Sequence, residues 1–266
     1  MQNKVAFLGA GNIAKAIMGG MLKQGMSPSS LFAADPSQSQ IASLAQGIEG
    51  FSDNLAAIKQ ADIVVLAVKP NTIAELCVSL APAIEDRLVI SVAAGIQSDT
   101  LQAGLGASVP IIRCMPNTPA LVQAGMTGLF ATSNVTDAQK LSAEHILSAI
   151  GLFEWFTREE DLDAVTAVSG SGPAYFFLVI EAMEAAAVEL GLTAEVAHQL
   201  VTQTALGAAL MARDAADPVS TLRNNVTSPG GTTAAAINSL TEDQIPAIFA
   251  RAMASAHKRS IELANE

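Results

Sequence analysis

The segment that most constrains the fold lies near the start of the chain, where an apolar run, Val5–Leu8, leads into the turn GAGNIA. Such a run is typical of a buried strand, and the mixed apolar and polar residues after the turn are typical of a helix. In a strand–turn–helix unit, Gly9 permits the tight turn, Gly11 lets backbone N–H groups approach a pyrophosphate, and Ala14 lets the helix pack closely on the strand. We therefore expect a dinucleotide-binding unit. The alternative is a glycine-rich turn that binds nothing.

The first 160 residues repeat this alternation of short apolar runs with amphipathic stretches. The predicted strands are Val5–Leu8, Leu31–Ala34, Ile63–Val68, Leu88–Val92, Ile111–Arg113, Gly128–Ala131 and Leu152–Trp155. Runs without polar residues, such as IVVLAV, favour strands that are buried on both faces of a parallel sheet. We predict a Rossmann-like, doubly wound α/β domain over residues 1–163.

The residue pattern changes after about residue 163, where alanine becomes frequent and helical stretches replace the strand runs. The predicted helices are Ala174–Leu190, Ala194–Ala215, Thr232–Leu240 and Ile245–Ala264. Gly191 fits a helix stop, and Thr193 fits the N-cap of the next helix. We predict an all-helical domain over residues 164–266. Its small side chains favour interleaved helices in a homodimer, although a compact monomeric bundle would have a similar composition.

The composition argues against several classes of function. Mean hydropathy is +0.39, yet the longest uncharged stretch, Cys114–Thr136, contains prolines and polar residues, so we expect no membrane span. A net charge of −11 with only 14 lysines and arginines disfavours nucleic-acid binding. Cys77 and Cys114 form neither a disulfide framework nor a metal-binding motif. The three histidines, His145, His198 and His257, share no ligand spacing, so we expect no metal site. Because the chain starts directly with a predicted strand and shows no signal peptide, we expect a cytoplasmic protein.

The second predicted strand is followed by Asp35, at a position where an acidic side chain would bind the adenosine ribose and favour NADH. Asp35-Pro36 also fits a helix N-cap followed by proline at the first helical position. Ser37 and Ser39 could instead serve the 2′-phosphate of NADPH. The residues leave ribose recognition and capping open, so we expect NADPH or NADH as the cofactor.

Three further segments follow predicted strands, so they lie at the carboxyl edge of the sheet, where the ligand crevice of such folds opens. Two of them are Ala67-Val68-Lys69-Pro70 and Ala93-Ala94-Gly95. Lys69 would face either the cofactor or the solvent. The third is stiffened by two prolines, and there we expect Asn117 to line the nicotinamide pocket.

The most informative segment is LRNNVTSPGGTT, at residues 222–233. Hydroxyl residues flank Pro-Gly-Gly immediately before a predicted helix. Glycines allow backbone N–H groups to form an anion-binding nest, and a helix N-terminus adds partial positive charge. The loop would therefore seat a carboxylate without an arginine or lysine. A helix-capping loop would explain Thr232 or Thr233 alone, but not the whole run.

Taken together, these segments resemble the pyrroline-5-carboxylate reductase family. The likeness spans essentially the whole chain through FLGAGNIAKAI, LAVKP, VAAG, RCMPNTPA, AVSGSGPAY and NNVTSPGGTTAAAINSL, in the family's order. The last motif is highly specific to the family, whereas the first is not. The resemblance implies reduction of 1-pyrroline-5-carboxylate to L-proline, the last step of proline biosynthesis, with NADPH or NADH. It also implies a Rossmann domain joined to a helical dimerisation domain, in a homodimer or a ring of dimers.

The resemblance also assigns residues to the site. Those that would contact the dinucleotide are Leu8, Gly9, Ala10, Gly11, Asn12, Ile13, Asn54, Ala67, Val68, Lys69, Pro70, Ala93, Ala94 and Gly95, while Asn225 would contact the cofactor or support the site. Those that would hold the substrate carboxylate are Ser228, Gly230, Gly231, Thr232 and Thr233. Thr233 would lie nearest the ring nitrogen, and Thr166 is the second candidate catalytic residue. Asp35 departs from the family, which often has a small hydroxyl residue there, and this leaves the choice between NADPH and NADH open.

The implied chemistry needs no catalytic histidine or lysine. A protonated cyclic imine accepts hydride directly, so the protein mainly binds and orients its ligands. A hydroxyl such as that of Thr233, or a water that it holds, would steady or protonate the nitrogen. The β-hydroxyacid dehydrogenases share the two-domain plan but use a lysine on the first long helix after the Rossmann domain, and no lysine occurs between Lys140 and Lys258. A non-catalytic dinucleotide-binding sensor would need GAGNIA but not SPGGTT.

Overall fold

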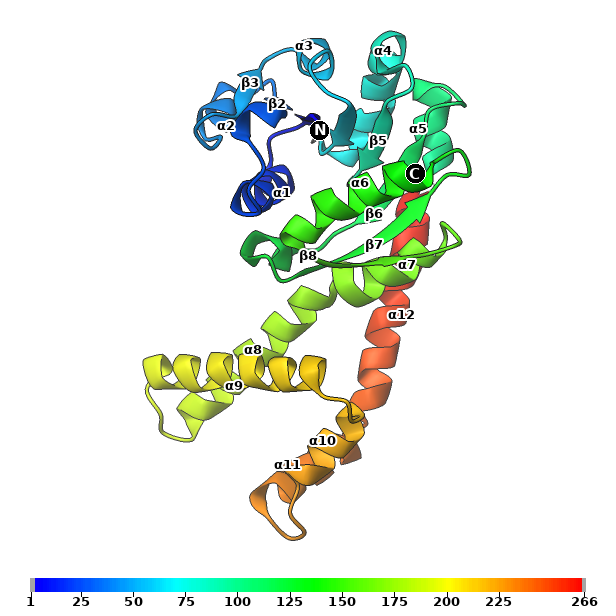
Figure 1. Cartoon of the computed structure of the whole chain (residues 1–266). Helices are drawn as coiled ribbons and strands as arrows, with labels where there is room; N and C mark the ends of the chain where they lie inside the picture. Colours follow the sequence, from blue (N-terminus) through cyan, green and yellow to red (C-terminus); the bar gives the residue numbers. More distant parts are fainter. Residues whose placement is uncertain (1–2, 265–266) are drawn as a thin grey trace. The chain divides into compact units, whose positions relative to one another are not determined.

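The computed structural model describes residues 3–264, which divide into two compact units (Figure 1). The first unit contains residues up to Ser171 together with those from Ala256 onward, and the second contains Gly172–Ser255. The domain boundary that we predict after residue 163 stays a prediction. By their contacts, the next eight residues, up to Ser171, belong to the first unit.

The first unit is built on one eight-stranded sheet. Its strands are β1 (Val5–Leu8), β2 (Leu31–Ala34), β3 (Glu49–Phe51), β4 (Ile63–Leu66), β5 (Leu88–Ser91), β6 (Ile111–Met115), β7 (Gly125–Ala131) and β8 (Gly151–Trp155). The spatial order is β3-β2-β1-β4-β5-β6-β7-β8, and neighbouring strands are parallel except for the antiparallel pair β6 and β7. The strand order reverses direction between β1 and β4, which makes this the switch point where doubly wound sheets bind ligands. The predicted α/β class is confirmed.

Helices cover both faces of the sheet because successive strand residues point to opposite sides. Side chains from alternate positions of the central strands pack against α1 (Asn12–Lys23) and α6 (Asp137–Leu147) on one face. The remaining positions pack against α3 (Asn54–Ile58), α4 (Ile73–Ile84) and α5 (Ser98–Leu105) on the other. Both layers are buried apolar cores, which fix where each strand ends and therefore where the loops of the carboxyl edge begin.

The remaining short elements of the first unit connect these layers. They are α2 (Gln38–Ala42), α7 (Asp161–Val165), the π-helical turn η5 (Thr166–Gly170), and the 3-10 turns η1 (Pro28–Ser30), η2 (Pro70–Thr72), η3 (Thr118–Val122) and η4 (Ser148–Ile150). The contact between α1 and η4 is especially tight. A Cβ added to Gly20 would lie 2.1 Å from the carbonyl oxygen of Ala149, so this position accepts no side chain.

The second unit is helical, as predicted. It contains α8 (Gly172–Glu189), α9 (Ala194–Asp214), α10 (Val219–Asn225), α11 (Thr232–Glu242) and the first half of α12 (Ile245–Ala264), whose second half belongs to the first unit. Between α8 and α9, the Thr193 hydroxyl accepts a hydrogen bond from the backbone N–H of Val196, which confirms the predicted N-cap. The Glu184 carboxylate lies 2.8 Å from Nδ1 of His198 and ties α8 to α9.

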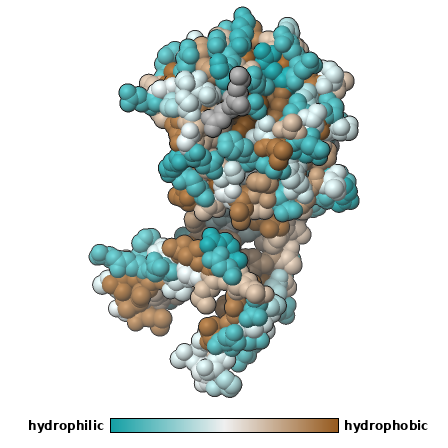
Figure 2. Space-filling view, in the orientation of Figure 1, coloured by the Kyte–Doolittle hydropathy of each residue, from teal (hydrophilic) through white to brown (hydrophobic). Residues whose placement is uncertain are grey.

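Large apolar side chains of the second unit are exposed. On α8 only Gly172 is buried, whereas Phe176 and Phe177 are 72% and 65% exposed. Figure 2 shows such brown, apolar residues gathered on the helices of this unit. Within the described residues, Asp161–Glu189 is the one helical stretch that is long and apolar enough to cross a membrane by length and composition. Exposed apolar side chains in such number are typical of a surface that contacts another protein or a membrane.

Candidate active site

The glycine-rich turn lies at the switch point of the sheet. Gly9 has a φ of +95°, and a Cβ there would lie 2.6 Å from the carbonyl oxygen of Ala67, so both the conformation and the contact require glycine. Its N–H donates to the carbonyl of Ala34, and the Ala67 N–H donates to the carbonyl of Leu8, each at 2.8 Å. The turn is therefore held from both neighbouring strands.

The start of α1 is open to a ligand. Gly11 is the N-cap of α1, no side chain caps the helix, and no atom lies within 4 Å of the Cβ position of Gly11. The first N–H groups of the helix therefore have no side-chain acceptor, and they lie beside a glycine that lets a ligand approach the backbone. These features fit a dinucleotide pyrophosphate.

Asp35 is bonded into this turn. One carboxylate oxygen accepts the backbone N–H of Ala10 at 2.9 Å, and the other accepts the backbone N–H of Ser37 at 2.8 Å. The N-cap of α2 is Ser37, so the alternative in which Asp35 caps the helix is wrong. Asp35 instead links the end of β2 to the glycine turn. Each oxygen keeps a further lone pair, so ribose recognition stays a prediction.

A cavity of about 320 Å³ lies at the carboxyl edge of the sheet. It is lined by Pro70, Ala94, Gly95, Ile96, Thr166, Ser171, Ala256, Arg259, Ser260 and Leu263. The sequence-predicted residues Pro70, Ala94, Gly95 and Thr166 are thus brought together. The wall from α12 was not predicted; it is anchored by the buried Ser260, whose hydroxyl donates to Asp163 Oδ1 at 2.6 Å.

An acidic side chain that sequence reasoning missed anchors the loop after β5. The Glu159 carboxylate accepts the backbone N–H of Ser98 at 2.6 Å and the guanidinium of the buried Arg113 at 2.7 Å, and it also accepts the Ser98 hydroxyl. Glu159 thereby supplies an acceptor at the N-terminus of α5, where negative charge is favoured. Because α5 follows Gly95 closely, this network fixes the end of the loop that lines the cavity.

The two remaining polar candidates near the cavity are already hydrogen-bonded. Asn117 donates through Nδ2 to the carbonyl of Ser169 at 3.0 Å, and its Oδ1 accepts the N–H of Met126 at 2.9 Å. Its predicted contact with the cofactor remains a prediction. The half-buried Thr166 donates its hydroxyl proton to the carbonyl of Leu162 at 2.8 Å. The Thr166 oxygen can therefore offer its lone pairs to a ligand.

The other predicted cofactor residues sit at strand ends of the same edge or in the second unit. Asn54 is the first residue of α3, which Asp53 caps, and Lys69 is exposed directly after β4. Asn225 ends α10 in the second unit and is exposed. Their contacts with a dinucleotide remain predictions.

The SPGGTT loop of the second unit connects α10 to α11. Gly230 has a φ of +72°, as a glycine-dependent nest requires, and Gly231 is the N-cap of α11. No side chain caps this helix, and within the described residues the Thr233 hydroxyl makes no hydrogen bond. Simple helix capping by Thr232 or Thr233 is therefore not what the structure has. The start of α11 stays open to an anion beside Ser228, which is exposed.

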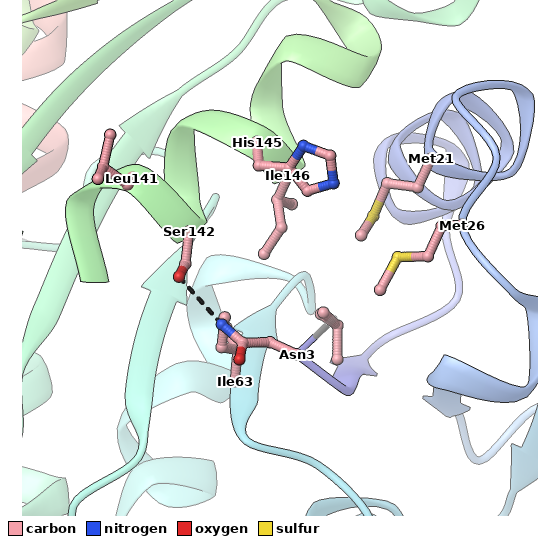
Figure 3. Close-up of a pocket in the computed structure, with 9 residues that line it drawn as sticks. Asn3, Met21, Met26, Ile63, Leu141, Ser142, His145 and Ile146 are labelled. Atoms are coloured by element: carbon pink, nitrogen blue, oxygen red, sulfur yellow. Dashed lines mark hydrogen bonds between the residues drawn. The ribbon is translucent and has the colours of Figure 1, made fainter. Parts of the chain in front are cut away.

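A second cavity, of about 250 Å³, lies at the opposite edge of the sheet (Figure 3). Val5 and Ile63, which begin β1 and β4, line it together with Met21, Met26 and Ile146. Two of its polar side chains bond each other, since Asn3 donates to the Ser142 hydroxyl at 3.0 Å. No predicted site residue lies here. Among the described residues no three histidines, cysteines or acidic side chains are grouped as metal ligands.

Comparisons with known proteins agree along the chain. Residues 159–263 match the family of pyrroline-5-carboxylate reductase dimerisation domains, and residues 4–95 match the coenzyme F420-dependent NADP oxidoreductases. The pyrroline-5-carboxylate reductase of Pseudomonas aeruginosa is 46% identical, over 99% of this chain and 97% of its own length.

Two solved structures are similar over 99% of both chains. A pyrroline-5-carboxylate reductase of Coxiella burnetii superimposes with a TM-score of 0.95 at 40% identity. The pyrroline carboxylate reductase of Plasmodium falciparum, solved with NADP bound, superimposes with a TM-score of 0.89 at 30% identity.

Proposed function

The chain belongs to the pyrroline-5-carboxylate reductase family, and from this premise we propose how its residues divide the work. The protein is an oxidoreductase that reduces 1-pyrroline-5-carboxylate to L-proline with NADPH or NADH, the last step of proline biosynthesis. The observation that carries this conclusion is the likeness to named reductases over 99% of the chain. It is supported by an open dinucleotide turn in one unit and an open anion nest in the other.

The first unit binds the dinucleotide in this proposal. The N–H groups at the start of α1 receive the pyrophosphate, since no side chain caps this helix and the Cβ position of Gly11 is open. The loops after β4 and β5 face the nicotinamide half, because they line the cavity at the carboxyl edge. A bound NADPH or NADH supplies the hydride for the reaction. Asp35 faces the adenosine ribose at the end of β2.

The SPGGTT loop of the second unit binds the substrate carboxylate. The Gly231 N–H already donates to the Ser228 carbonyl at 3.0 Å, so the backbone N–H groups that attract the anion are those of the first turn of α11, together with the dipole of that helix. The hydroxyls of Ser228 and Thr232 add donors. This arrangement suits a chain with a net charge of −11, because the anion is bound by backbone dipoles and needs no basic side chain. Thr233, in the first turn of α11, is the hydroxyl that faces the ring nitrogen.

Thr166 is the second hydroxyl assigned to the nitrogen. Its proton is held by the Leu162 carbonyl, so its oxygen accepts a hydrogen bond from a protonated imine. A charged acceptor is not required, because a hydroxyl lone pair stabilises the N–H without quenching the positive charge that makes the ring carbon electrophilic. Among residues 3–264 the Thr233 hydroxyl has no such partner, so it can either donate or accept.

We also propose a homodimer located in the cytoplasm. The family match of residues 159–263 is to dimerisation domains, and α8 exposes large apolar side chains that a second copy would cover. The alternative assembly is a larger ring of such dimers. The exposed apolar stretch is thereby assigned to contact with protein and not to a lipid bilayer.

The test of the function is an assay of imine-dependent oxidation of NADPH and NADH by the purified chain, with detection of proline. Turnover of the imine is expected; inactivity with it, together with turnover of a hydroxy acid, would contradict the assignment.

The test of Thr233 compares Thr233→Ala with Thr233→Ser. Loss of a hydrogen bond to the reacting nitrogen should lower kcat/KM by about ten- to a hundredfold in the alanine variant, while serine retains most activity.

The stability of Thr233→Ala separates this role from a structural one. Removing the hydroxyl loses no hydrogen bond to the part of the chain that the structure describes, and alanine is the better helix former by about 0.5 kcal/mol, so the free energy of unfolding should not fall. NADPH affinity, titrated by fluorescence, should also stay unchanged. Wild-type kcat/KM in this variant would remove Thr233 from the site, and loss of NADPH binding would assign the loop to the cofactor.

A further inference from the structure

The π-helical turn η5 contains a backbone carbonyl, that of Ser169, whose usual α-helical donor is missing. In an α-helix the Ser169 carbonyl would accept the N–H of the residue four positions on. That residue is Pro173, which has no N–H. The turn is also widened at this point, because the Ser171 N–H donates to the Thr166 carbonyl, five residues back, at 2.7 Å.

The amide of Asn117 supplies the missing donor. Its Nδ2 donates to the Ser169 carbonyl at 3.0 Å, across 52 residues of sequence, while its Oδ1 accepts the Met126 N–H at 2.9 Å. One side chain thus links η5 to the start of β7. Close packing reinforces the link, because a Cβ on Gly170 would lie 2.6 Å from the methyl carbon of Met115.

The turn that Asn117 holds also presents Thr166 to the cavity at the carboxyl edge. Thr166 is the first residue of η5, and its hydroxyl direction is set by its bond to the Leu162 carbonyl. A shift of the turn would therefore move the Thr166 oxygen directly. Misplacement of a group at a reacting centre by about 1 Å is enough to cost up to about a hundredfold in rate.

We propose that Asn117 is a positioning residue, whose amide holds the π-helical turn so that Thr166 meets the nitrogen of the imine. This inference rests on the proposed function and assigns Asn117 a role that acts through Thr166 and not through the cofactor. Pi-helical turns are frequent at functional sites, where they re-aim side chains. Here Pro173 removes the helical donor to the Ser169 carbonyl, and Asn117, from a distant loop, supplies another donor.

The experiment is a double-mutant cycle on the full chain. Asn117→Asp keeps the side-chain volume and the acceptor for Met126, but it replaces the donor to Ser169 with a carboxylate. We expect kcat/KM for the imine to fall about tenfold, with the dissociation constant of NADPH unchanged within about twofold. In a Thr166→Val background, the same substitution should lower kcat/KM by less than about twofold, because the two residues act as one unit.

Asn134→Asp is the matched control. Asn134 also donates to a backbone carbonyl, that of Ser108 at 2.7 Å, and it accepts a hydrogen bond from Thr132. It lies after the last residue of β7, next to the start of β6. Its kinetic constants should equal those of the wild type. Asn117→Ala removes both hydrogen bonds without adding charge and should give the same pattern as the aspartate variant, which keeps the test decisive if the carboxylate prevents folding.

Three results would overturn the inference: additive losses in the cycle, a loss of NADPH affinity in parallel with kcat/KM, or an equal kinetic loss in the Asn134 control. Absence of imine turnover by the wild-type chain would be a different failure. It would refute the proposed function itself, and the positioning role with it. The two failures are therefore distinguished by the wild-type measurement alone.

Discussion

Substitution of Asp35 tests both its structural role and its role in cofactor choice. The carboxylate accepts one N–H from the buried Ala10 and one from Ser37. Asp35→Asn keeps one acceptor oxygen, so one of the two N–H groups must face the amide NH2 instead. Leaving a buried donor unsatisfied costs about 1–3 kcal/mol of stability. At about 2–4 °C per kcal/mol for a chain of this size, Tm should fall by about 2–12 °C.

The same substitution removes a negative charge beside the predicted position of the adenosine ribose. Repulsion between two unit charges near a protein surface is about 4 kcal/mol at 4 Å, and it falls with distance and with salt. We therefore expect about 1.4 kcal/mol, a tenfold rise in the ratio of kcat/KM for NADPH to kcat/KM for NADH. Asp35→Ser, which also shortens the side chain, should shift the ratio in the same direction.

Steady-state kinetics with both cofactors, together with thermal unfolding, measure the two effects separately. The control is Asp62→Asn, which removes the same charge and also weakens a carboxylate bond to a backbone N–H, that of Lys4 at 2.9 Å, just before β4. It should leave the cofactor ratio unchanged. A ratio unaltered in Asp35→Asn, despite a lowered Tm, would refute ribose recognition and leave Asp35 as a structural link to the glycine turn.

Three further outcomes are expected. Arg113→Met leaves the Glu159 carboxylate without its buried cation, so urea unfolding should show a loss of about 3 kcal/mol; a loss below 1 kcal/mol would contradict the importance of this pair. Phe176→Glu places a charge on the exposed apolar face of α8, so sedimentation should show dissociation toward monomer, whereas an unchanged mass would place the interface elsewhere. Burial raises the pKa of the Cys77 thiol to about 11 and that of Cys114 still further, so little thiolate exists at pH 8 and Ellman's reagent should label neither until urea is added; rapid labelling of the native protein would contradict their burial.

The strands of the sheet were predictable because burial on both faces leaves continuous apolar runs. Val5–Leu8 and Leu31–Ala34 match the structure at both ends. β3 (Glu49–Phe51) was not predicted, since it has three residues and begins with a charged side chain and a glycine. Its place is set by pairing with β2, a contact that no local pattern encodes. The short α10 (Val219–Asn225) was likewise missed, and its second half lies in the segment 222–233 that we interpreted as a loop.

The residues of the candidate site that could be predicted are those whose role depends on local conformation, and those that could not depend on contacts between distant residues. Gly9 and Gly11 can be identified from the local sequence, because a tight turn and a close approach of the backbone to a pyrophosphate both need glycine. Glu159 gives no local signal, since its partner Arg113 lies 46 residues away and on another element. The orphan carbonyl of Ser169 is implied by Pro173, but its donor, Asn117, follows only from the tertiary structure.

The division of α12 between the two units has a consequence for how the chain is made. Synthesis runs from the N-terminus, and domains generally begin to fold as they emerge from the ribosome. The wall that Ser260 and Leu263 give to the cavity belongs to the first unit, yet it is translated after the whole of the second. A nascent chain can complete its sheet early, but it acquires this wall only when the final turns of α12 have emerged. Full assembly of the cavity is thus deferred until translation has passed through every helix of the second unit.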